Sequence, residues 1–496
     1  MTRRTHLPEG RLLPLIIATG LFMENLDATV LSTALPTIAR DFGSSPIHLK
    51  LALTSYLLSL AIFIPASGWM ADRFGARTVF RAAIVVFGIG SIACGFSNGL
   101  AELVVARVLQ GMGGAMMTPV GRLVILKTTP KHDLVNAMAW LTIPALLGPI
   151  CGPPVGGFIT TFFSWRWIFW INIPIAVVGF VLTTLHVPNV REDEHRRFDL
   201  IGFLLVGPGL AALLTGSTLA GLGMVDPATT VAVVTSGAIL LALYVRHALI
   251  VEFPLIELRL LRFASFRASI GGGFLFRIGV GATPFLLPLL FQLGFDFSPF
   301  QSGLLTLSTG LGAMMMKTLA ARILRRWGFR RVLVTNAVIS SVLVAAPALF
   351  HVGVPVVAMA AILLVAGFVR SLQFTSINVS SVSDVPPALM GRVTSFTSVV
   401  QELAGSVGVS VAALGLEASM RASGTTTIGS QLFPPVFLLV GGIAMLSTFS
   451  FWRMPRDAGN NMLTPVEREQ DVATTLSPAI PPTFGRFRPD PASVRE

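Results

Sequence analysis

The sequence Gly148-Pro149-Ile150-Cys151-Gly152-Pro153-Pro154-Val155-Gly156-Gly157 lies inside a long apolar segment, where glycine and proline normally destabilise a helix. In a helix interior, glycine costs about 1 kcal/mol and proline about 3 kcal/mol relative to alanine. Neighbouring helices can offset this cost by packing closely against a surface with few side chains. The stretch therefore predicts a bent, smooth and closely packed helix, which suits a moving or sealing element. An ordinary packing face of small residues is the alternative interpretation.

The composition excludes an ordinary soluble protein. Of the 496 residues, 53% are hydrophobic and only 12% are charged. Soluble domains carry about 25% charged residues, and a bilayer can accommodate apolar surface that a soluble chain could not bury. The two cysteines, Cys94 and Cys151, lie in apolar segments and indicate neither a disulfide framework nor a metal site.

Apolar segments of spanning length recur along the chain. We recognise fourteen, which are residues 12–34, 49–69, 78–97, 101–122, 134–158, 165–187, 199–220, 228–248, 268–291, 300–321, 330–350, 353–375, 391–414 and 432–453. The pattern predicts an all-α polytopic membrane protein with fourteen transmembrane helices. Because the number of spans is even, both termini should lie on the same side of the membrane.

The formal net charge of +12 is explained by membrane topology. Most of the 36 Lys and Arg residues fall in loops on one side, whereas the opposite loops hold only Arg40, Lys50, Arg166 and Arg421. Cytoplasmic loops of membrane proteins are enriched in basic residues. We therefore expect cytoplasmic termini, and a lipid bilayer rather than nucleic acid as the partner.

An internal repeat predicts the domain organisation. Asp72-Arg73-Phe74-Gly75-Ala76-Arg77 follows the second span, and Arg325-Arg326-Trp327-Gly328-Phe329-Arg330 follows the tenth. Two six-helix bundles with a two-helix insert would give this spacing, and repeated halves are a common plan for transporters. The predicted parts are a bundle over 1–190, a charged linker with two inserted helices and an amphipathic segment over 191–267, a second bundle over 268–453, and a disordered tail over 454–496.

Four motifs occur in a characteristic order. They are Leu26-Asp27-Ala28-Thr29 through Ala34-Leu35-Pro36, then Gly68-Trp69-Met70-Ala71-Asp72-Arg73-Phe74-Gly75-Ala76-Arg77, then Arg107-Val108-Leu109-Gln110-Gly111, and finally the Gly148–Gly157 stretch. This set resembles the major facilitator superfamily, and specifically its fourteen-helix drug–proton antiporter branch. The resemblance covers nearly the whole chain except the tail. It implies a multidrug exporter that resides in the bacterial cytoplasmic (inner) membrane, and we expect a monomer.

The resemblance also implies roles for particular residues. The antiporter motif of the fifth span would comprise Gly148, Gly152, Pro153, Gly156 and Gly157. A cytoplasmic gate would comprise Gly68, Asp72, Arg73, Gly75, Arg77 and Arg392. Asp72 should face the start of the thirteenth span near Arg392, where a helix N-terminus favours a carboxylate, and so hold the two bundles together in the outward-open state.

Ionisable residues deep in the spans are candidates for proton coupling, because each costs at least about 2.5–3.5 kcal/mol to insert. These residues are Glu24, Asp27, Arg107, Arg277 and Glu402. Burial and a neighbouring like charge both favour the neutral form of a carboxyl, so Glu24 or Asp27 could take up and release a proton. We predict an ion pair between Asp27 and Arg107 that protonation of Asp27 would break. A permanent structural pair is the alternative, and Glu402 could pair with Arg277.

The substrate cavity should be mainly apolar. Its candidate residues are Gln110, Arg277, Gln373, Phe276, Met117 and Phe396. Aromatic and methionine surfaces can repack around varied ligands, the glutamines could orient a substrate, and Arg277 could attract an anionic group. Packing or lipid-facing positions are the alternative for the apolar members.

These observations favour proton-coupled export of small amphiphilic or drug-like molecules, driven by the proton gradient without another cofactor. No phosphate-binding glycine loop with a lysine is present, so ATP-driven transport is not expected. The histidines lack metal-binding spacing, and nothing in the sequence predicts an enzyme. A dedicated metabolite exporter, a proton–solute symporter and a non-transporting receptor are the alternatives.

Overall fold

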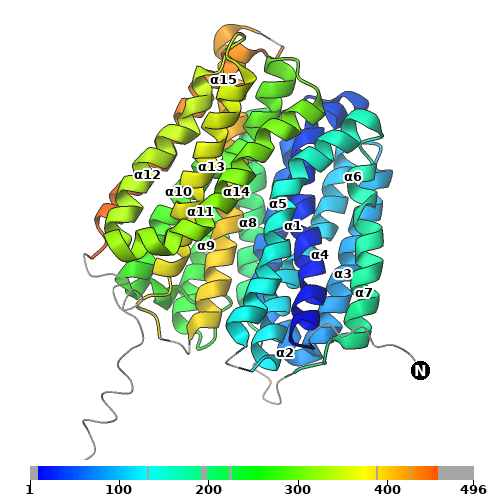
Figure 1. The fold of residues 1–496 in the computed structure, drawn as a ribbon, viewed down its shortest axis with the longest axis vertical. Helices are drawn as coiled ribbons and strands as arrows, with labels where there is room; N and C mark the ends of the chain where they lie inside the picture. Colours follow the sequence, from blue (N-terminus) through cyan, green and yellow to red (C-terminus); the bar gives the residue numbers. More distant parts are fainter. Residues whose placement is uncertain are drawn as a thin grey trace, which may run out of the picture.

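The computed structural model describes residues 9–130, 133–191, 198–222, 226–386, 389–425 and 427–455, and these residues contain helices but no strand (Figure 1). The helices of the first half are α1 (Glu9–Asp41), α2 (Lys50–Phe74), α3 (Ala76–Phe96), α4 (Leu100–Thr128), α5 (Leu134–Phe162), α6 (Trp167–Trp170) and α7 (Asn172–His186). Two further helices follow, α8 (Leu200–Leu222) and α9 (Pro227–Ile250).

The second half begins with the short helix η1 (Leu258–Arg262). It continues with α10 (Ala264–Leu289), the π-helical turn η2 (Leu290–Gly294), α11 (Pro299–Trp327), α12 (Phe329–Ala345), η3 (Ala346–Leu349), α13 (Val356–Ser380), α14 (Met390–Ser423), η5 (Ser430–Leu432) and α15 (Phe433–Trp452). We call α1–α7 the N-terminal half and α10–α15 the C-terminal half.

The predicted fold class is confirmed. Within the described residues, thirteen helical segments are long and apolar enough to cross a membrane. The remaining predicted span is α8, a helix of 23 residues whose shorter apolar stretch covers Leu200–Gly216. Helices α6 and α7 form one span, because Trp167–His186 counts as a single segment.

The two halves pack against each other along two helix pairs. In the N-terminal half, α1 packs on α5 and α4 packs on α2 and α3; in the C-terminal half, α11 packs on α13 and α10 on α14 and α15. Between the halves, α5 packs on α11 and α14 packs on α2. Helix α2 ends and α3 begins at Gly75, and we call this end of the molecule the Gly75 end. The opposite end, where α2 begins at Lys50, is called the Lys50 end.

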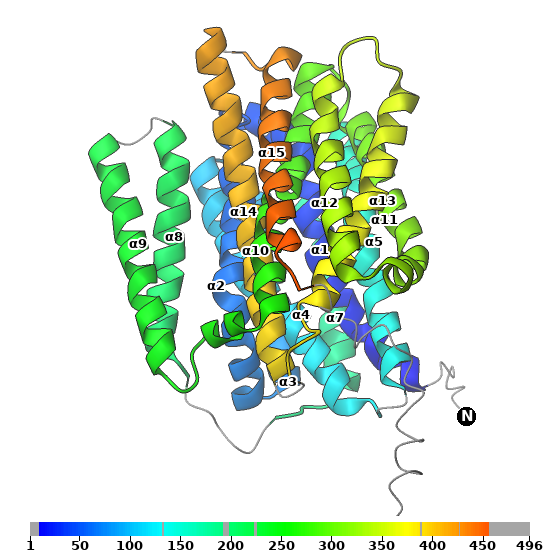
Figure 2. The ribbon, with the colours of Figure 1, turned by 90° about the vertical axis from the view of Figure 1, so that its left-hand side faces the viewer.

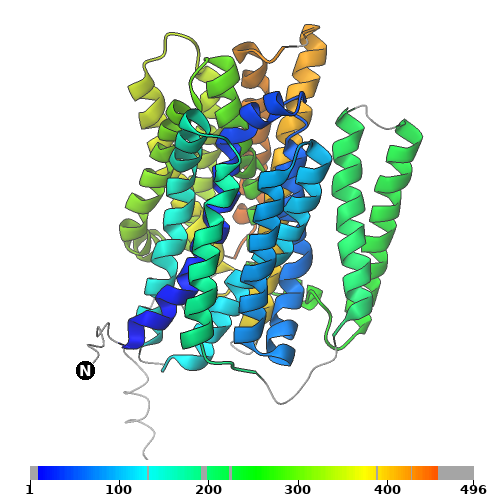
Figure 3. The same cartoon turned by 90° about the vertical axis from the view of Figure 1, so that its right-hand side faces the viewer.

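Helices α8 and α9 form a hairpin at the side of the molecule, visible in Figures 2 and 3. Only 11% of the spanning window of α9 is buried, so most of its surface would face lipid. The hairpin is fastened at its base by Asp199, whose carboxylate binds His247 Nε2 at 2.7 Å and the backbone N–H of Leu255 at 3.0 Å.

The internal repeat corresponds to two similar turns. Gly75 joins α2 to α3 with φ +90°, and Gly328 joins α11 to α12 with φ +74°. Both residues therefore occupy the left-handed region, which glycine adopts without the penalty that a side chain incurs. The domain boundaries stay a prediction, and the predicted tail lies outside the described residues from residue 456 onward, as do residues 192–197 of the linker.

Candidate functional site

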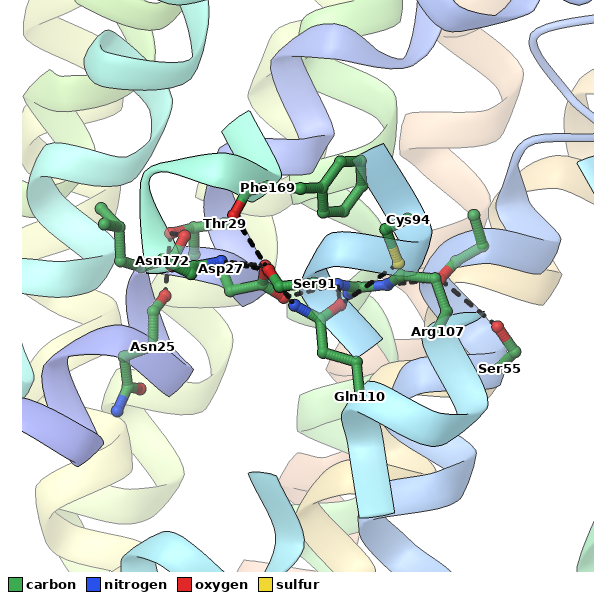
Figure 4. A network of polar contacts seen from close by, with 12 residues as sticks. Asn25, Asp27, Thr29, Ser55, Ser91, Cys94, Arg107, Gln110, Phe169 and Asn172 are labelled. Atoms are coloured by element: carbon green, nitrogen blue, oxygen red, sulfur yellow. Dashed lines mark hydrogen bonds and ion pairs between the residues drawn. The ribbon is translucent and has the colours of Figure 1, made fainter. Parts of the chain in front are cut away.

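Asp27 lies at the centre of a buried polar network in the N-terminal half (Figure 4). Its side chain is on α1 and only 2% exposed. One carboxylate oxygen forms an ion pair with the Arg107 guanidinium on α4. The other accepts hydrogen bonds from Gln110 Nε2 at 2.8 Å and from Asn172 Nδ2 at 2.9 Å. The predicted contact between Asp27 and Arg107 is thus present, and its role in proton coupling stays a prediction.

Arg107 is held on three sides. Its Nη1 atom also donates to Gln110 Oε1 at 2.6 Å, and its Nε donates to the Ala52 carbonyl oxygen at 3.2 Å. The guanidinium stacks over the Tyr56 ring, 4.0 Å from the ring centroid. A guanidinium that is completely buried needs such partners, because removing one member of a buried charge pair typically costs about 3–5 kcal/mol.

Ser91 connects the network to α6 and α7. Its hydroxyl donates to the Phe169 carbonyl oxygen at 3.0 Å and accepts from Gln110 and Asn172, each at 3.0 Å. Figure 4 shows these side chains converging from four spans. Asn172 and Ser91 were not among the sequence-derived candidates. A signal existed, since an asparagine is rare in an apolar span and this one follows directly on the break between α6 and α7.

Glu24 has separate partners from Asp27, although it is only three residues earlier on α1. Its carboxylate accepts a hydrogen bond from Thr118 Oγ1 on α4 at 2.7 Å. Glu402, on α14 of the opposite half, lies near enough to repel Glu24 electrostatically. The side chains of Glu24 and Glu402 are both half-buried. Glu24 and Glu402 are thus near enough to interact electrostatically although they belong to different halves, whereas Asp27 is enclosed in its own half.

Arg277 does not form the predicted ion pair with Glu402 in this structure. Its Nη2 atom donates instead to Asn378 Oδ1 on α13 at 2.9 Å. Glu402 acts on Arg277 only through longer-range electrostatics. The pairing was one of two interpretations that the sequence left open, and the other concerned an anionic substrate group.

A cavity of about 600 Å³ opens at the Gly75 end between α2, α4 and α14. Its lining includes Asp72, Arg122, Phe253, Arg392 and Thr118. Thr118 is the residue that binds Glu24, so this carboxylate lies one hydrogen bond behind the cavity wall. The cavity therefore lies next to Glu24, which also interacts electrostatically with Glu402 of the C-terminal half.

The predicted gate residues line or adjoin this cavity. Gly68, Asp72, Arg73 and Arg392 contribute to its wall, while Gly75 forms the turn and Arg77 lies half-buried at the start of α3. In this conformation Asp72 binds Lys127 Nζ at 3.2 Å. The contact expected between Asp72 and Arg392 is absent, because the cavity separates the two halves at this end.

Arg392 has a different partner from the expected one. Its guanidinium binds Glu257 Oε2 at 2.6 Å, and the Glu257 side chain is only 5% exposed. Glu257 belongs to the segment that links α9 to η1. The segment after the inserted hairpin therefore contacts the start of α14, and sequence reasoning had not identified Glu257.

The Gly148–Gly157 stretch of α5 forms a seam with two faces. A Cβ atom added to Gly148 would lie 2.8 Å from the Leu26 backbone nitrogen, and one added to Gly156 would lie 2.5 Å from the Val30 oxygen; one added to Gly152 would overlap Thr29. These three glycines face α1. The small-residue surface predicted from the sequence is present, and the four prolines of α5 remain within one continuous helix.

The second face of the seam lies against α11. A Cβ atom on Gly157 would overlap the Pro299 carbonyl oxygen, and one on Gly303 would overlap the carbonyl oxygen of Pro153. The Phe300 backbone N–H also donates to Thr161 Oγ1 at 3.0 Å. Helix α5 thus connects the two halves closely at the Lys50 end.

Two polar contacts reinforce that closure. Gln292 Nε2 donates to the Thr33 carbonyl oxygen at 2.9 Å, and Lys50 Nζ lies 3.6 Å from Glu417 Oε1. Each contact joins the N-terminal half to the C-terminal half. The structure is therefore sealed at the Lys50 end and hollow at the Gly75 end.

Most of the residues expected in the cavity are packed inside a half instead. Gln110 belongs to the Asp27 network, and Gln373 on α13 is fully buried with its amide bonded to Asn336 and to the Leu333 carbonyl oxygen. Met117 and Phe276 are also completely buried, and Phe396 is 7% exposed against Phe266. Buried amides require partners and apolar side chains gain by leaving water, so in this conformation the packing interpretation applies to these five residues.

Known proteins resemble this chain over most of its length. The family model described as Major Facilitator Superfamily matches residues 17–409. A protein named "Putative multidrug resistance protein MdtD" from Salmonella heidelberg (strain SL476) is 39% identical over 470 residues, which cover 92% of this chain and 98% of the relative. The protein of the same name from Escherichia coli (strain K12) is 39% identical over 469 residues, with the same coverage.

A solved structure shares the fold. The crystal structure of a D-xylose–proton symporter matches with a TM-score of 0.64 and covers 90% of this chain and 98% of that chain. Its sequence identity is 17%, so the similarity concerns the arrangement of the helices alone.

Proposed function

This chain belongs to the Major Facilitator Superfamily, and we propose that it is a proton-coupled antiporter that exports small amphiphilic or drug-like molecules by alternating access. It is a multi-pass membrane transporter rather than an enzyme. The relatives named for multidrug resistance support the substrate class. The observation that carries the proposal is the buried network of Asp27 and Arg107, next to a second carboxylate that lies directly behind a cavity.

The direction of transport rests on topology. The basic loops lie at the Gly75 end, and basic loops favour the cytoplasmic side. In a bacterial inner membrane the cavity would then open to the cytoplasm, with both termini on that side. The seam between α5 and α11 would close the outer side, so the structure corresponds to an inward-open state.

Proton coupling would involve Glu24 and Glu402 first and Asp27 second. Glu24 is near the cavity through Thr118 and within electrostatic range of Glu402, so a proton on either acid would relieve their repulsion. Protonation of Asp27 would remove the charge that holds Arg107. Because this pair joins α1 to α4, its loss would weaken the link between these two helices. The proton state would thereby bias the choice between inward-open and outward-open states.

Closure of the cavity would bring its walls together. Asp72 and Arg392 lie on opposite walls, and each has a partner in the present conformation. In the outward-open state Arg392 would exchange Glu257 for Asp72. The new pair would hold the cavity walls together and would release Glu257 and Lys127 from their present partners.

The test is transport by the purified chain in proteoliposomes with an imposed pH gradient and a panel of cationic, neutral and anionic dyes. We expect the wild type to move dye against the proton flux. Asp27→Asn should still bind dye and lose gradient-driven transport. Asp41→Asn is the matched control, because Asp41 is an acid at the Lys50 end of the same helix whose partners are Trp165 and Arg166.

Gradient-driven transport at the full rate in Asp27→Asn would refute the coupling role. Movement of dye together with protons would identify a symporter instead. Transport of a single metabolite and none of the dyes would indicate a dedicated exporter.

A further inference from the structure

Arg277 on α10 is a buried cation with incomplete hydrogen bonding. Its side chain is 3% exposed, and only its Nη2 atom has a partner, which is Asn378 Oδ1. Its Nε and Nη1 atoms are buried and make no hydrogen bond within the described residues. Arg107, by contrast, is paired with a carboxylate. Glu402 acts on Arg277 only at longer range, and buried donors without hydrogen-bond partners are costly, so this position can receive an acceptor.

The surroundings of Arg277 suit a flat, negatively charged group. The guanidinium stacks on the Phe374 ring, 5.5 Å from its centroid, and Phe276 meets the same ring edge-on at 5.7 Å. A Cβ atom on Gly273 would lie 3.1 Å from Nη1, so the absence of a side chain there keeps this face of the guanidinium open. The site thus combines a charged fork with an aromatic surface.

Asn378 adds a second donor and a route of access. Its amide oxygen accepts from Arg277, so its NH₂ group is directed away from that bond. The Asn378 side chain is exposed, and Phe374 is half-buried one turn earlier on α13. Helices α10 and α13 pack mainly on other neighbours rather than on each other. The exposed Asn378 side chain therefore lies between the surface and the buried Arg277 donors.

A second arginine reinforces the positive potential. Arg370, Phe374 and Asn378 are spaced four residues apart and so share a face of α13. The helix continues to Ser380, which places Arg370 about 15 Å from the helix end at 1.5 Å per residue. No carboxylate lies within 4 Å of either arginine within the described part of the chain. The acids Glu24 and Glu402 are on other helices.

We propose that Arg277, Asn378 and Phe374 form a subsite for a carboxylate attached to an aromatic ring system, so that the substrates include aromatic carboxylates and zwitterions. This inference rests on the proposed export function and specifies its substrate class. A planar fork matches a carboxylate through two parallel hydrogen bonds. The aromatic surface would contact the attached ring.

A binding experiment tests the subsite without requiring transport. The probes are rhodamine B, which carries a carboxylate, and its ethyl ester, which has the same ring system without that charge. Binding of each dye to the full-length protein in detergent is followed by fluorescence anisotropy. The proteins are the wild type, Arg277→Gln, Arg277→Lys and, as control, Lys317→Gln, which removes an exposed cation from α11.

We expect Arg277→Gln to weaken rhodamine B binding by about tenfold or more, since hydrogen bonds to charged groups are the stronger ones. The ester should change by less than about twofold on the same scale. Arg277→Lys should lie between, because it keeps the charge but loses the fork, and Lys317→Gln should match the wild type. Equal weakening of both dyes, or no weakening of either, would overturn the subsite.

Dye transport in proteoliposomes separates this inference from the function on which it rests. If the wild type moves the ester but Arg277→Gln leaves rhodamine B transport unchanged, export stands and the subsite is wrong. If the wild type moves neither dye under a pH gradient, the export proposal fails and the inference, as a statement about substrates, falls with it.

Discussion

Replacing Gly157 by alanine should loosen the seal at the Lys50 end. The new Cβ atom would overlap the Pro299 carbonyl oxygen and would lie 2.8 Å from the Pro299 carbonyl carbon and 2.9 Å from Phe300 Cα. Carbon atoms normally approach to about 3.5–4.0 Å. The obstacle is backbone, which cannot rotate away as a side chain can. Helices α5 and α11 must therefore separate by about 1 Å in the sealed state.

The cost falls on one conformation only. Overpacking of this kind costs about 1–3 kcal/mol, and a state in which α5 and α11 have parted does not incur it. An energy difference of that size shifts an equilibrium by about 5- to 150-fold. Gly157→Ala should consequently move the population away from the conformation sealed at the Lys50 end and towards one that is open there.

Distances between pairs of spin labels can measure this shift. One pair reports the Lys50 end, with cysteines at the exposed positions Phe163 and Val352. A second pair reports the Gly75 end, with cysteines at Thr78 and Arg331, which are also exposed. The native Cys94 and Cys151 are first replaced by alanine. We expect longer distances at the Lys50 end and shorter distances at the Gly75 end.

Gly442→Ala serves as the matched control. A Cβ atom there would meet nothing within 4 Å, so the distance distributions should equal those of the wild type. Gly303→Ala perturbs the same contact from the side of α11, since its Cβ would overlap the Pro153 carbonyl oxygen of α5. If Gly157→Ala and Gly442→Ala give the same distributions, the contact between α5 and α11 does not hold the outer side closed.

Three further outcomes are expected. Lys50→Met should destabilise the protein, because it leaves the half-buried Glu417 without its counter-ion, while the additional change Glu417→Leu should restore much of the loss. Thermal unfolding of both variants decides this, and additive effects would argue against a coupled pair. Gly75→Ala should lower the free energy of unfolding by about 1–2 kcal/mol because its φ is +90°. Gly68→Ala is the control and should leave it unchanged, because no atom lies within 4 Å of the new methyl group. Equal melting temperatures of the two variants would disprove the strain at Gly75. Asn172→Leu removes a donor from the buried carboxylate network and should lower stability by about 1–3 kcal/mol; an unchanged denaturation midpoint would contradict the assignment.

The candidate site shows where sequence reasoning succeeds and where it stops. The contact between Asp27 and Arg107 could be predicted, since two opposite charges at similar depth in apolar helices lower their cost of burial by pairing. Gln110 could not be placed, because a buried amide has several ways to satisfy its hydrogen bonds, and its position one turn after Arg107 did not reveal which carboxylate it would bind. Asn172 and Ser91 were missed because a single amide or hydroxyl in a span has no periodicity of its own.

The contacts between the halves required the tertiary structure for a different reason. Arg392 binds Glu257 in this conformation, whereas the contact of Asp72 near Arg392 that the sequence predicts belongs to the outward-open state and stays a prediction. Arg277 and Glu402 are at similar depth but are not in ion-pair contact. Depth along a helix follows from residue number, but the direction of a side chain around the helix axis and the distance to the next helix do not.

What the sequence by itself determined is the all-helical membrane fold with its succession of spans and the closely packed fifth helix, while the orientation of the spans stays a prediction. These properties are local: length and hydropathy set each span, the side of the basic loops sets the topology, and glycines without side chains permit close packing. Only the tertiary structure decided which helices those glycines meet, which charges are paired, and that Arg277 keeps two unpartnered donors. Such properties depend on how whole helices are placed relative to one another, and many weak contacts spread along the chain determine that placement together.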